Sequence, residues 1–152
     1  MKKYLLTFII ALIIGFFLSN FFLKQYDDFE GIKVSNNGET LYFIQYGVFS
    51  SLESLEENTI ALQNYVYNKQ DNLYYVYVGI TKLKENAEKI INYYKSIGNE
   101  TIIKEYDITN KSFLGLLENY DTVLKNTNDE TAIASIINQV LVKYEEVVIS
   151  GG

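Results

Sequence analysis

Two stretches of sequence decide the fold, YFIQYGVFSSLESLEE at residues 42–57 and YYVYVGITKLKENAEK at residues 74–89. They repeat one pattern at an offset of 32 residues, which aligns Gly47 with Gly79. Each copy opens with a β-branched and aromatic run, typical of a strand, and continues after its glycine with a helical pattern. The repeat therefore predicts two strand–helix units in tandem.

Each predicted helix has a recognisable start. Residues 50–53, Ser-Ser-Leu-Glu, have the spacing of a capping box, and Thr81 can cap the second helix. Gly98 suits the left-handed position that follows the end of the second helix. The apolar positions of the first helix lie near one face: Leu55, Leu62 and Val66.

The remaining strands complete the order of elements. Between the copies, the sequence predicts a β-hairpin that turns around residues 69–72, Lys-Gln-Asp-Asn. A last strand is expected at about residues 101–106. The order is β-α-β-β-α-β over residues 41–108, the split βαβ (ferredoxin-like) arrangement, which predicts an α+β fold with one antiparallel sheet and two helices on one face.

Residues 109–152 predict a helical hairpin. The residues from Thr127 to Glu130 have capping-box spacing, and the second helix is expected to run from Asp129 to Val148. The two apolar stripes are Phe113, Leu117, Tyr120 and Leu124, and Ile133, Ile136, Ile137, Val140, Leu141 and Tyr144. The hairpin can pack on itself, on the preceding domain or against a partner.

The N-terminus predicts a membrane anchor over residues 1–24. Residues 4–23 carry no charge, and as a helix they span about 30 Å, the thickness of the hydrocarbon core. The run is longer than that of a cleavable signal peptide and has no small-x-small site at its end. Because two lysines precede it, the N-terminus is expected in the cytoplasm and the body outside it. Residues 25–40 are polar and predict a linker.

Composition excludes several classes of function. The 152 residues include no Cys and no His, so disulfide scaffolds, zinc sites, thiol nucleophiles and imidazole catalysis are ruled out. A net charge of −6 argues against a nucleic-acid partner. We expect no enzyme, no cofactor and no metal, because the acid pairs fit solvated helix faces or the linker. These pairs are Asp27-Asp28, Glu56-Glu57 and Glu145-Glu146.

At Ile44-Gln45-Tyr46-Gly47-Val48-Phe49 and Val76-Tyr77-Val78-Gly79, the chain resembles a SPOR (sporulation-related repeat) domain. The resemblance covers residues 41–108. It implies a bacterial βαββαβ domain that binds peptidoglycan, favouring glycan strands that amidases have stripped of stem peptides at the division septum or during sporulation. Two positions depart from the family pattern, Val48 and Ile80-Thr81, which leaves the preference for a particular glycan open.

Strand alternation predicts a binding face. If Ile44 and Tyr46 face the helices, the residues between and before them point from the open face. Aromatic rings there offer flat area to sugars, and a glutamine amide both donates and accepts hydrogen bonds. The candidate glycan-binding residues are Gln45, Phe43, Tyr75, Tyr77 and Ser50, the last as a substitute for the polar group absent at Val48. Two other readings stay open: the aromatics stabilise the sheet, or the hairpin covers this face.

These features together predict a non-enzymatic, single-pass membrane protein of the cell wall that binds peptidoglycan glycan strands in division or sporulation. The alternative is an extracytoplasmic protein–protein interaction module that binds no sugar. In that case the amphipathic helical hairpin at residues 109–152 would bind division or sporulation proteins.

Overall fold

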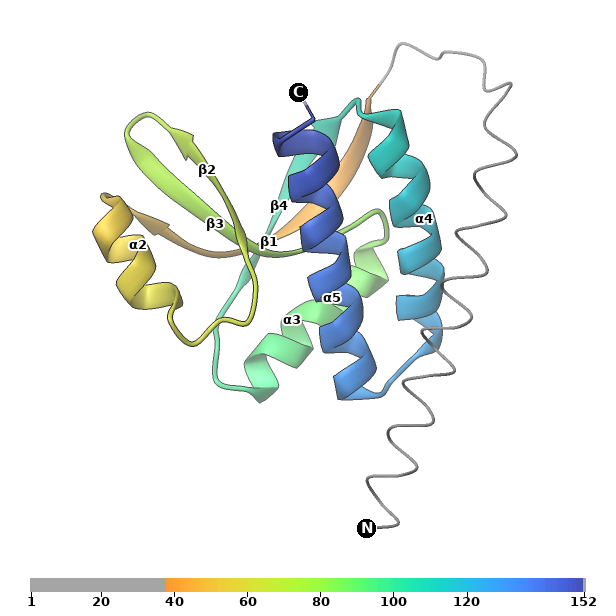
Figure 1. The fold of residues 1–152 in the computed structure, drawn as a ribbon. Coiled ribbons are helices and arrows are strands. Elements are labelled where there is room, and N and C mark those ends of the chain that lie inside the picture. Colours follow the sequence, from red (N-terminus) through yellow and green to blue (C-terminus); the bar gives the residue numbers. More distant parts are fainter. Residues whose placement is uncertain (1–37, 152) are drawn as a thin grey trace. The chain divides into compact units, whose positions relative to one another are not determined.

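The two repeat copies each form a strand followed by a helix. The computed structural model describes residues 38–151, and its first six elements follow the predicted βαββαβ order (Figure 1). They are β1 (Glu39–Phe49), α2 (Leu52–Thr59), β2 (Val66–Gln70), β3 (Leu73–Thr81), α3 (Lys84–Ser96) and β4 (Ile102–Ile108). The predicted α+β class and order of elements are therefore confirmed.

The sheet is antiparallel throughout and has the strand order β2-β3-β1-β4. The two repeat strands, β1 and β3, are its central pair. The hairpin turns at Asp71 and Asn72, whose φ angles of 51° and 61° are left-handed. A two-residue turn with positive φ at both positions matches the twist of the strands it joins, and Asn and Asp tolerate it. The hairpin predicted around residues 69–72 is confirmed.

Helices α2 and α3 lie on the sheet face that carries Ile44 and Gly79. These two residues are opposite each other, and a methyl group at Gly79 would lie only 2.9 Å from Ile90 Cγ2 of α3. On β1, the Tyr46 hydroxyl donates a hydrogen bond of 3.1 Å to the carbonyl of Asn58 in α2. The expectation that Ile44 and Tyr46 face the helices is correct.

The first helix is shorter than predicted. It ends at Thr59, and Val66 begins β2 opposite Tyr77 instead of extending the helix. The apolar spacing that favoured a longer helix is outweighed by pairing with β3, since residues 66–70 form an edge strand whose inward-facing backbone groups bond to β3. The capping box does work as predicted at Ser51, whose hydroxyl accepts a hydrogen bond from Ser54 N–H at 3.1 Å.

The second helix begins later than Thr81 but uses it. Leu83 occupies the cap position, and Thr81 Oγ1 accepts a hydrogen bond from Leu83 N–H at 3.1 Å. After the helix, Gly98 adopts a φ of +88°, as its predicted role requires.

The C-terminal residues form the predicted helical hairpin, α4 (Lys111–Asn126) and α5 (Glu130–Tyr144). A short π-helix, η1 (Glu145–Ile149), follows directly, so the regular helix ends four residues before the predicted Val148. Asp129, and not Thr127, caps α5: its Oδ1 accepts a hydrogen bond from Ala132 N–H at 2.8 Å.

The hairpin packs on the preceding elements, one of the three arrangements left open by the sequence. A buried carboxylate of α4, Asp121, accepts hydrogen bonds from the Thr81 hydroxyl, from Lys82 N–H at 2.7 Å and from the Asn86 amide at 3.1 Å. Burial raises the pKa of Asp121, although these three donors oppose the shift. This cluster joins α4 to the start of α3.

A single ammonium group joins the middle of α3 to the C-terminal end of α4. Lys89 Nζ, on α3, donates to the carbonyls of Leu124, Lys125 and Thr127 at 2.8, 3.0 and 2.7 Å. It thereby satisfies carbonyl groups that a helix leaves unpaired at its C-terminus. Residues Asn37–Gly152 consequently form one compact unit.

The predicted anchor at residues 4–23 and most of the predicted linker lie outside the described residues. The last two linker positions, 39 and 40, belong to β1. Among the helices of residues 38–151, none combines the length and apolar character needed to cross a bilayer.

Candidate functional site

Four of the five predicted site residues lie on one sheet face, which we call the Gln45 face after its central residue. Gln45 is opposite Tyr77 in the β1–β3 register, and the rings of Phe43 and Tyr77 meet edge to face at 5.3 Å. Tyr75 lies two residues before Tyr77 on β3 and so points to the same side. The side-chain alternation expected from the sequence is therefore present.

The expectation that this face is open is wrong over most of its area. Phe43 is 2%, Tyr77 5% and Gln45 7% exposed, whereas Tyr75 is half-buried. The cause is α5, which crosses the sheet and places Tyr144 against Phe43 at 5.5 Å (Figure 1). The helical hairpin of α4 and α5 has an apolar stripe that is stable only when buried, and it packs on the aromatic centre of the sheet.

Ser50, the fifth predicted residue, is exposed and lies beyond the end of β1, in the connection to α2. Its neighbour Ser51 provides the helix cap. Val48, the position that Ser50 was expected to replace, is 41% exposed and lies opposite Tyr75. An apolar side chain therefore stands on the exposed part of the Gln45 face.

Gln45 lies between two irregularities of the β1–β3 ladder. Tyr46 on β1 and Val78 on β3 have no register partner in the opposite strand. Bulges of this kind turn individual side chains and are frequent beside functional sites. The carbonyl of Val78 accepts a hydrogen bond from the buried Tyr94 hydroxyl at 3.0 Å, so this backbone group has a partner although Val78 has none in the ladder.

The carbonyl oxygen of Gln45, Oε1, is buried and has no hydrogen-bond partner within the described residues. Leaving a buried acceptor without a donor costs about 1–3 kcal/mol, so such groups are rare and need a reason. A donor that arrives with a ligand is one such reason. Gln45 is thus the chemically distinctive residue of this face.

Tyr106, on β4, belongs to the same face and was missed by the sequence reasoning. Its hydroxyl lies 2.6 Å from that of Tyr77, and its ring meets Phe43 at 5.2 Å. Burial and this neighbour raise the pKa of the Tyr77 phenol well above its ordinary value. Alternation along the last predicted strand could have indicated Tyr106, because β4 pairs with β1.

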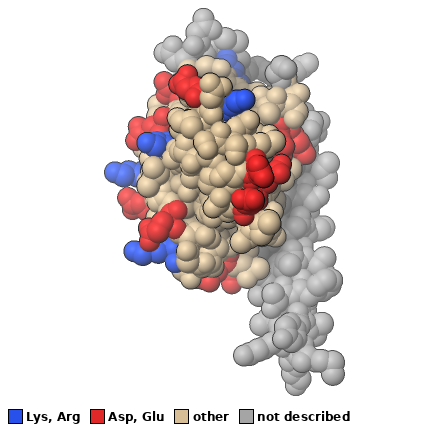
Figure 2. Space-filling model, turned by 90° about the vertical axis from the view of Figure 1, so that its left-hand side faces the viewer, with Lys and Arg blue, Asp and Glu red and all other residues tan. Residues whose placement is uncertain are grey.

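The part of the Gln45 face that α5 leaves uncovered lies toward the β2–β3 hairpin. Here Val48, Tyr75 and the exposed Asn68 of β2 form adjacent register partners. Figure 2 views the side of the molecule that presents α2 and the hairpin tip. The middle of this side carries few charged residues; acidic residues lie on both sides of it, together with lysines on the left.

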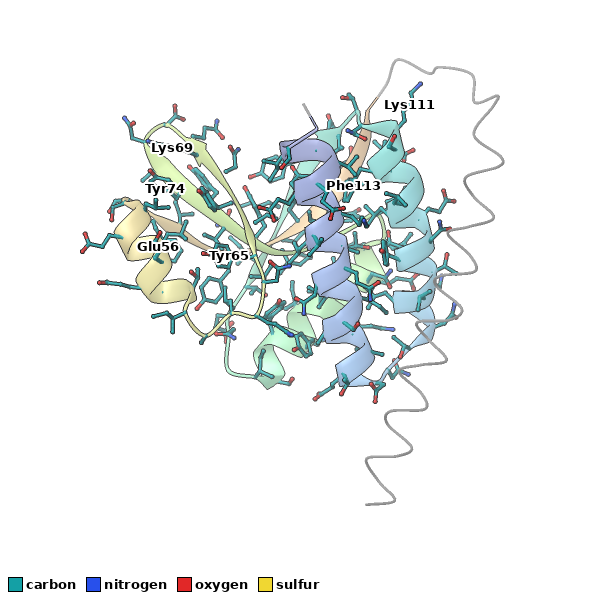
Figure 3. The ribbon with its side chains drawn as sticks, in the orientation of Figure 1. Glu56, Tyr65, Lys69, Tyr74, Lys111 and Phe113 are labelled. Atoms are coloured by element: carbon teal, nitrogen blue, oxygen red, sulfur yellow. The ribbon has the colours of Figure 1, made fainter. Side chains whose placement is uncertain are left out.

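The opposite face of the same hairpin is also aromatic. Tyr67 is 45% exposed and meets Tyr74 at 6.0 Å, and Lys69 Nζ lies 5.2 Å from the centre of the Tyr74 ring. Figure 3 shows Lys69 and Tyr74 together at the hairpin end, away from Phe113. The hairpin therefore carries tyrosines on both sides.

Away from the Gln45 face, a hollow of about 400 Å³ lies between α3 and the start of α5. Its lining includes Glu85, Glu88, Tyr93 and Glu130. Its Glu85 already pairs with Lys125 at 2.7 Å. Within residues 38–151, no three acidic groups come close enough together to hold a metal ion. The Gln45 face remains the candidate site.

Comparison with known proteins adds one likeness. No protein-family model matches the chain, and no curated protein matches it. Among solved structures, the chain is similar to the peptidoglycan-binding domain of the B. subtilis cell wall lytic enzyme CwlC. The identity is 29% over 50% of this chain and 99% of that domain, with a TM-score of 0.39. A likeness at this TM-score carries no argument about fold or function.

Proposed function

We propose that the chain is a non-enzymatic, membrane-anchored protein that binds peptidoglycan glycan strands through the Gln45 face. Two independent lines support the proposal. The motifs at residues 44–49 and 76–79 resemble those of SPOR domains, and the βαββαβ order that this resemblance implies is the order of the observed elements. Anchoring through residues 4–23, with the body outside the cytoplasm, and a role in division or sporulation are parts of the proposal that rest on the sequence.

The observation that carries the proposal is the unpartnered carbonyl of Gln45 beside aromatic rings. Sugar hydroxyls and the acetamide N–H of amino sugars are donors of the kind that would satisfy it, once the cover over this face moves and exposes the buried Oε1. Tyr75, a half-buried residue two positions from the register partner of Gln45, supplies the flat apolar surface on which a sugar ring can lie.

Charge is consistent with an uncharged ligand. The exposed neighbours on this face, Val48, Tyr75 and Asn68, are neutral, and the chain as a whole carries a formal charge of −6. The negative charge of the chain would repel anionic partners. A glycan strand without its stem peptides has lost charged groups, so it would not be repelled in this way.

The alternative, a protein-interaction module that uses the helical hairpin, loses the observation that suggested it. The apolar face of α5 lies inside the domain, where Ile136 and Val140 are 2% and 3% exposed. Asp substitutions at these positions would unfold the domain and so cannot report on recruitment.

The test is binding of the full-length, detergent-solubilised protein to purified sacculi, with and without prior amidase treatment. We expect stronger binding to the treated wall. Tyr75→Ala should weaken binding about fivefold, since a stacked ring contributes roughly 1 kcal/mol. Tyr67→Ala is the control for removing a tyrosine from this hairpin, because Tyr67 is even more exposed than Tyr75 and points to the opposite side. Equal effects of the two variants, or no binding by folded wild type, would contradict the proposal.

A further inference from the structure

Tyr144 closes the centre of the Gln45 face. It is the last residue of α5, and its ring meets Phe43 at 5.5 Å and Phe113 of α4 at 5.1 Å. Beneath it, Phe43 also meets the rings of Tyr77 and Tyr106. Tyr144 thus covers the Phe43 side of an aromatic trio that adjoins Gln45; Phe43 and Tyr77 are buried, and Tyr106 is 37% exposed.

The segment that follows Tyr144 is weakly held. None of the five residues of η1 is buried, and Ile149 is 50% exposed. The Asn110 amide donates a hydrogen bond of 3.1 Å to the carbonyl of Val147, and Lys143 pairs with Glu146 on the surface. The π-helical geometry is itself uncommon and occurs mostly at functional positions.

The rest of α5 is fixed, in contrast. Its buried residues are Ile133, Ile136, Ile137, Val140 and Leu141. Movement of the whole helix would expose this core, whereas movement of the last turn exposes little besides Tyr144 and what lies under it. A boundary between a fixed and a movable part therefore falls between Leu141 and Tyr144.

We propose that residues 144–151 form a lid over a second sugar subsite, built from Phe43, Tyr77 and Tyr106 beside Gln45. This inference rests on the proposed function, and the subsite takes the ring of an uncharged sugar of the same glycan. While the lid is closed, Phe43 and Tyr77 stay buried, and only the part of the face around Tyr75 and the outer edge of Tyr106 are available. The apparent affinity is then reduced by the fraction of molecules in which the lid is open.

The variant Asn110→Asp weakens the attachment of the lid while keeping the helix cap that the fold needs. Asn110 has two roles: its Oδ1 accepts a hydrogen bond from Phe113 N–H and caps α4, and its amide holds Val147. Aspartate keeps the capping oxygen, being as good a cap as asparagine, but cannot donate to the Val147 carbonyl. We expect Asn110→Asp to tighten binding to amidase-treated sacculi about fivefold, the value of one ordinary hydrogen bond.

A truncation after Lys143 removes the lid altogether and should tighten binding by tenfold or more. The matched control is Val142→Ala, since Val142 is 41% exposed and lies on the same helix just before the proposed boundary. That variant should bind as the wild type does. Tighter binding by Val142→Ala, or unchanged binding by both lid variants, would overturn the inference.

Hydrogen exchange distinguishes a lid that opens on binding from a segment that only stabilises the fold. On addition of amidase-released glycan strands to the full-length protein, residues 144–151 should exchange faster while β1 becomes protected. Protection of residues 144–151 on binding would overturn the lid. If no glycan binds to any variant, the proposed function fails. In that case, faster exchange in β1 of Asn110→Asp alone would still show that the segment is a movable cover.

Discussion

Replacing Gln45 by leucine should make the protein more stable and less able to bind. Leucine is apolar and has a volume not far from that of glutamine, although it branches at Cγ, so the substitution removes the buried Oε1 that has no partner. A buried acceptor without a partner destabilises the fold by about 1–3 kcal/mol. The substitution removes this penalty and adds only a small packing cost, because the two side chains have similar volumes. We expect the free energy of unfolding to rise by about 1–2 kcal/mol.

The assay is urea unfolding of wild type and Gln45→Leu, followed by the many tyrosines of the chain through their fluorescence. The denaturation midpoint should rise while the slope of unfolding stays the same, since the surface exposed on unfolding hardly changes. In parallel, the same two preparations are tested on amidase-treated sacculi, where the variant should lose most of its binding. Opposite changes in stability and binding mark a residue kept for function.

A fall in stability of 1 kcal/mol or more in Gln45→Leu would refute the reasoning. It would show that Oε1 is satisfied in the folded protein, for example by an ordered water molecule, and that the amide stabilises the sheet. Gln70→Leu, at an exposed position of β2, is the control for replacing glutamine by leucine in this sheet and should leave both stability and binding nearly unchanged.

Three further predictions concern the fold. Asp121→Ala should lower the free energy of unfolding by about 2 kcal/mol in thermal or urea unfolding, because it removes the carboxylate that three donors share. Lys82 N–H loses its acceptor, whereas the Asn86 amide keeps the backbone carbonyl of residue 121. A loss below 1 kcal/mol would mean that relief of the buried charge compensates. Gly79→Ala should cost about 1–2 kcal/mol by crowding Ile90, whereas Gly115→Ala, with open space around it in α4, should gain up to about 1 kcal/mol; equal effects of the two would contradict this packing. Above pH 10, stability should fall by about 1.4 kcal/mol per pH unit for Tyr77 and for each other tyrosine that stays protonated in the fold, because its unfolded form ionises first; a flat profile between pH 10 and 11 would show that these phenols are accessible.

Local patterns were enough to predict much of the architecture. The repeat with Gly47 and Gly79 fixed two strand–helix units, and the polar tetrapeptide at residues 69–72 fixed the hairpin between them. Both signals act over a few residues, through backbone conformations that particular side chains favour or tolerate. Strand alternation then placed Phe43, Gln45, Tyr75 and Tyr77 on one face, since the alternation is a property of the strand alone.

The cover over that face could not be read in the same way. A helix with an apolar stripe must bury it, but the stripe does not say which surface it will meet. Here the partner was chosen by contacts between residues far apart in the chain, such as Tyr144 with Phe43 and Asp121 with Thr81. The end of α2 was misjudged for a related reason, because the pairing of Val66 with Tyr77 joins residues of different elements.

The dependence of the sheet on α5 sets the order in which the chain can acquire its structure during synthesis. The ribosome completes β4 at residue 108 some thirty residues before Leu141, one of the last buried residues of α5, is made. Throughout that interval the nascent chain has all four strands but lacks the helix that buries Phe43 and Tyr77, and exposed aromatic strands are prone to association. Folding of the sheet face is therefore completed only after α5 has been synthesised, and a ribosome stalled within α4 or α5 would release a product with these aromatic residues uncovered.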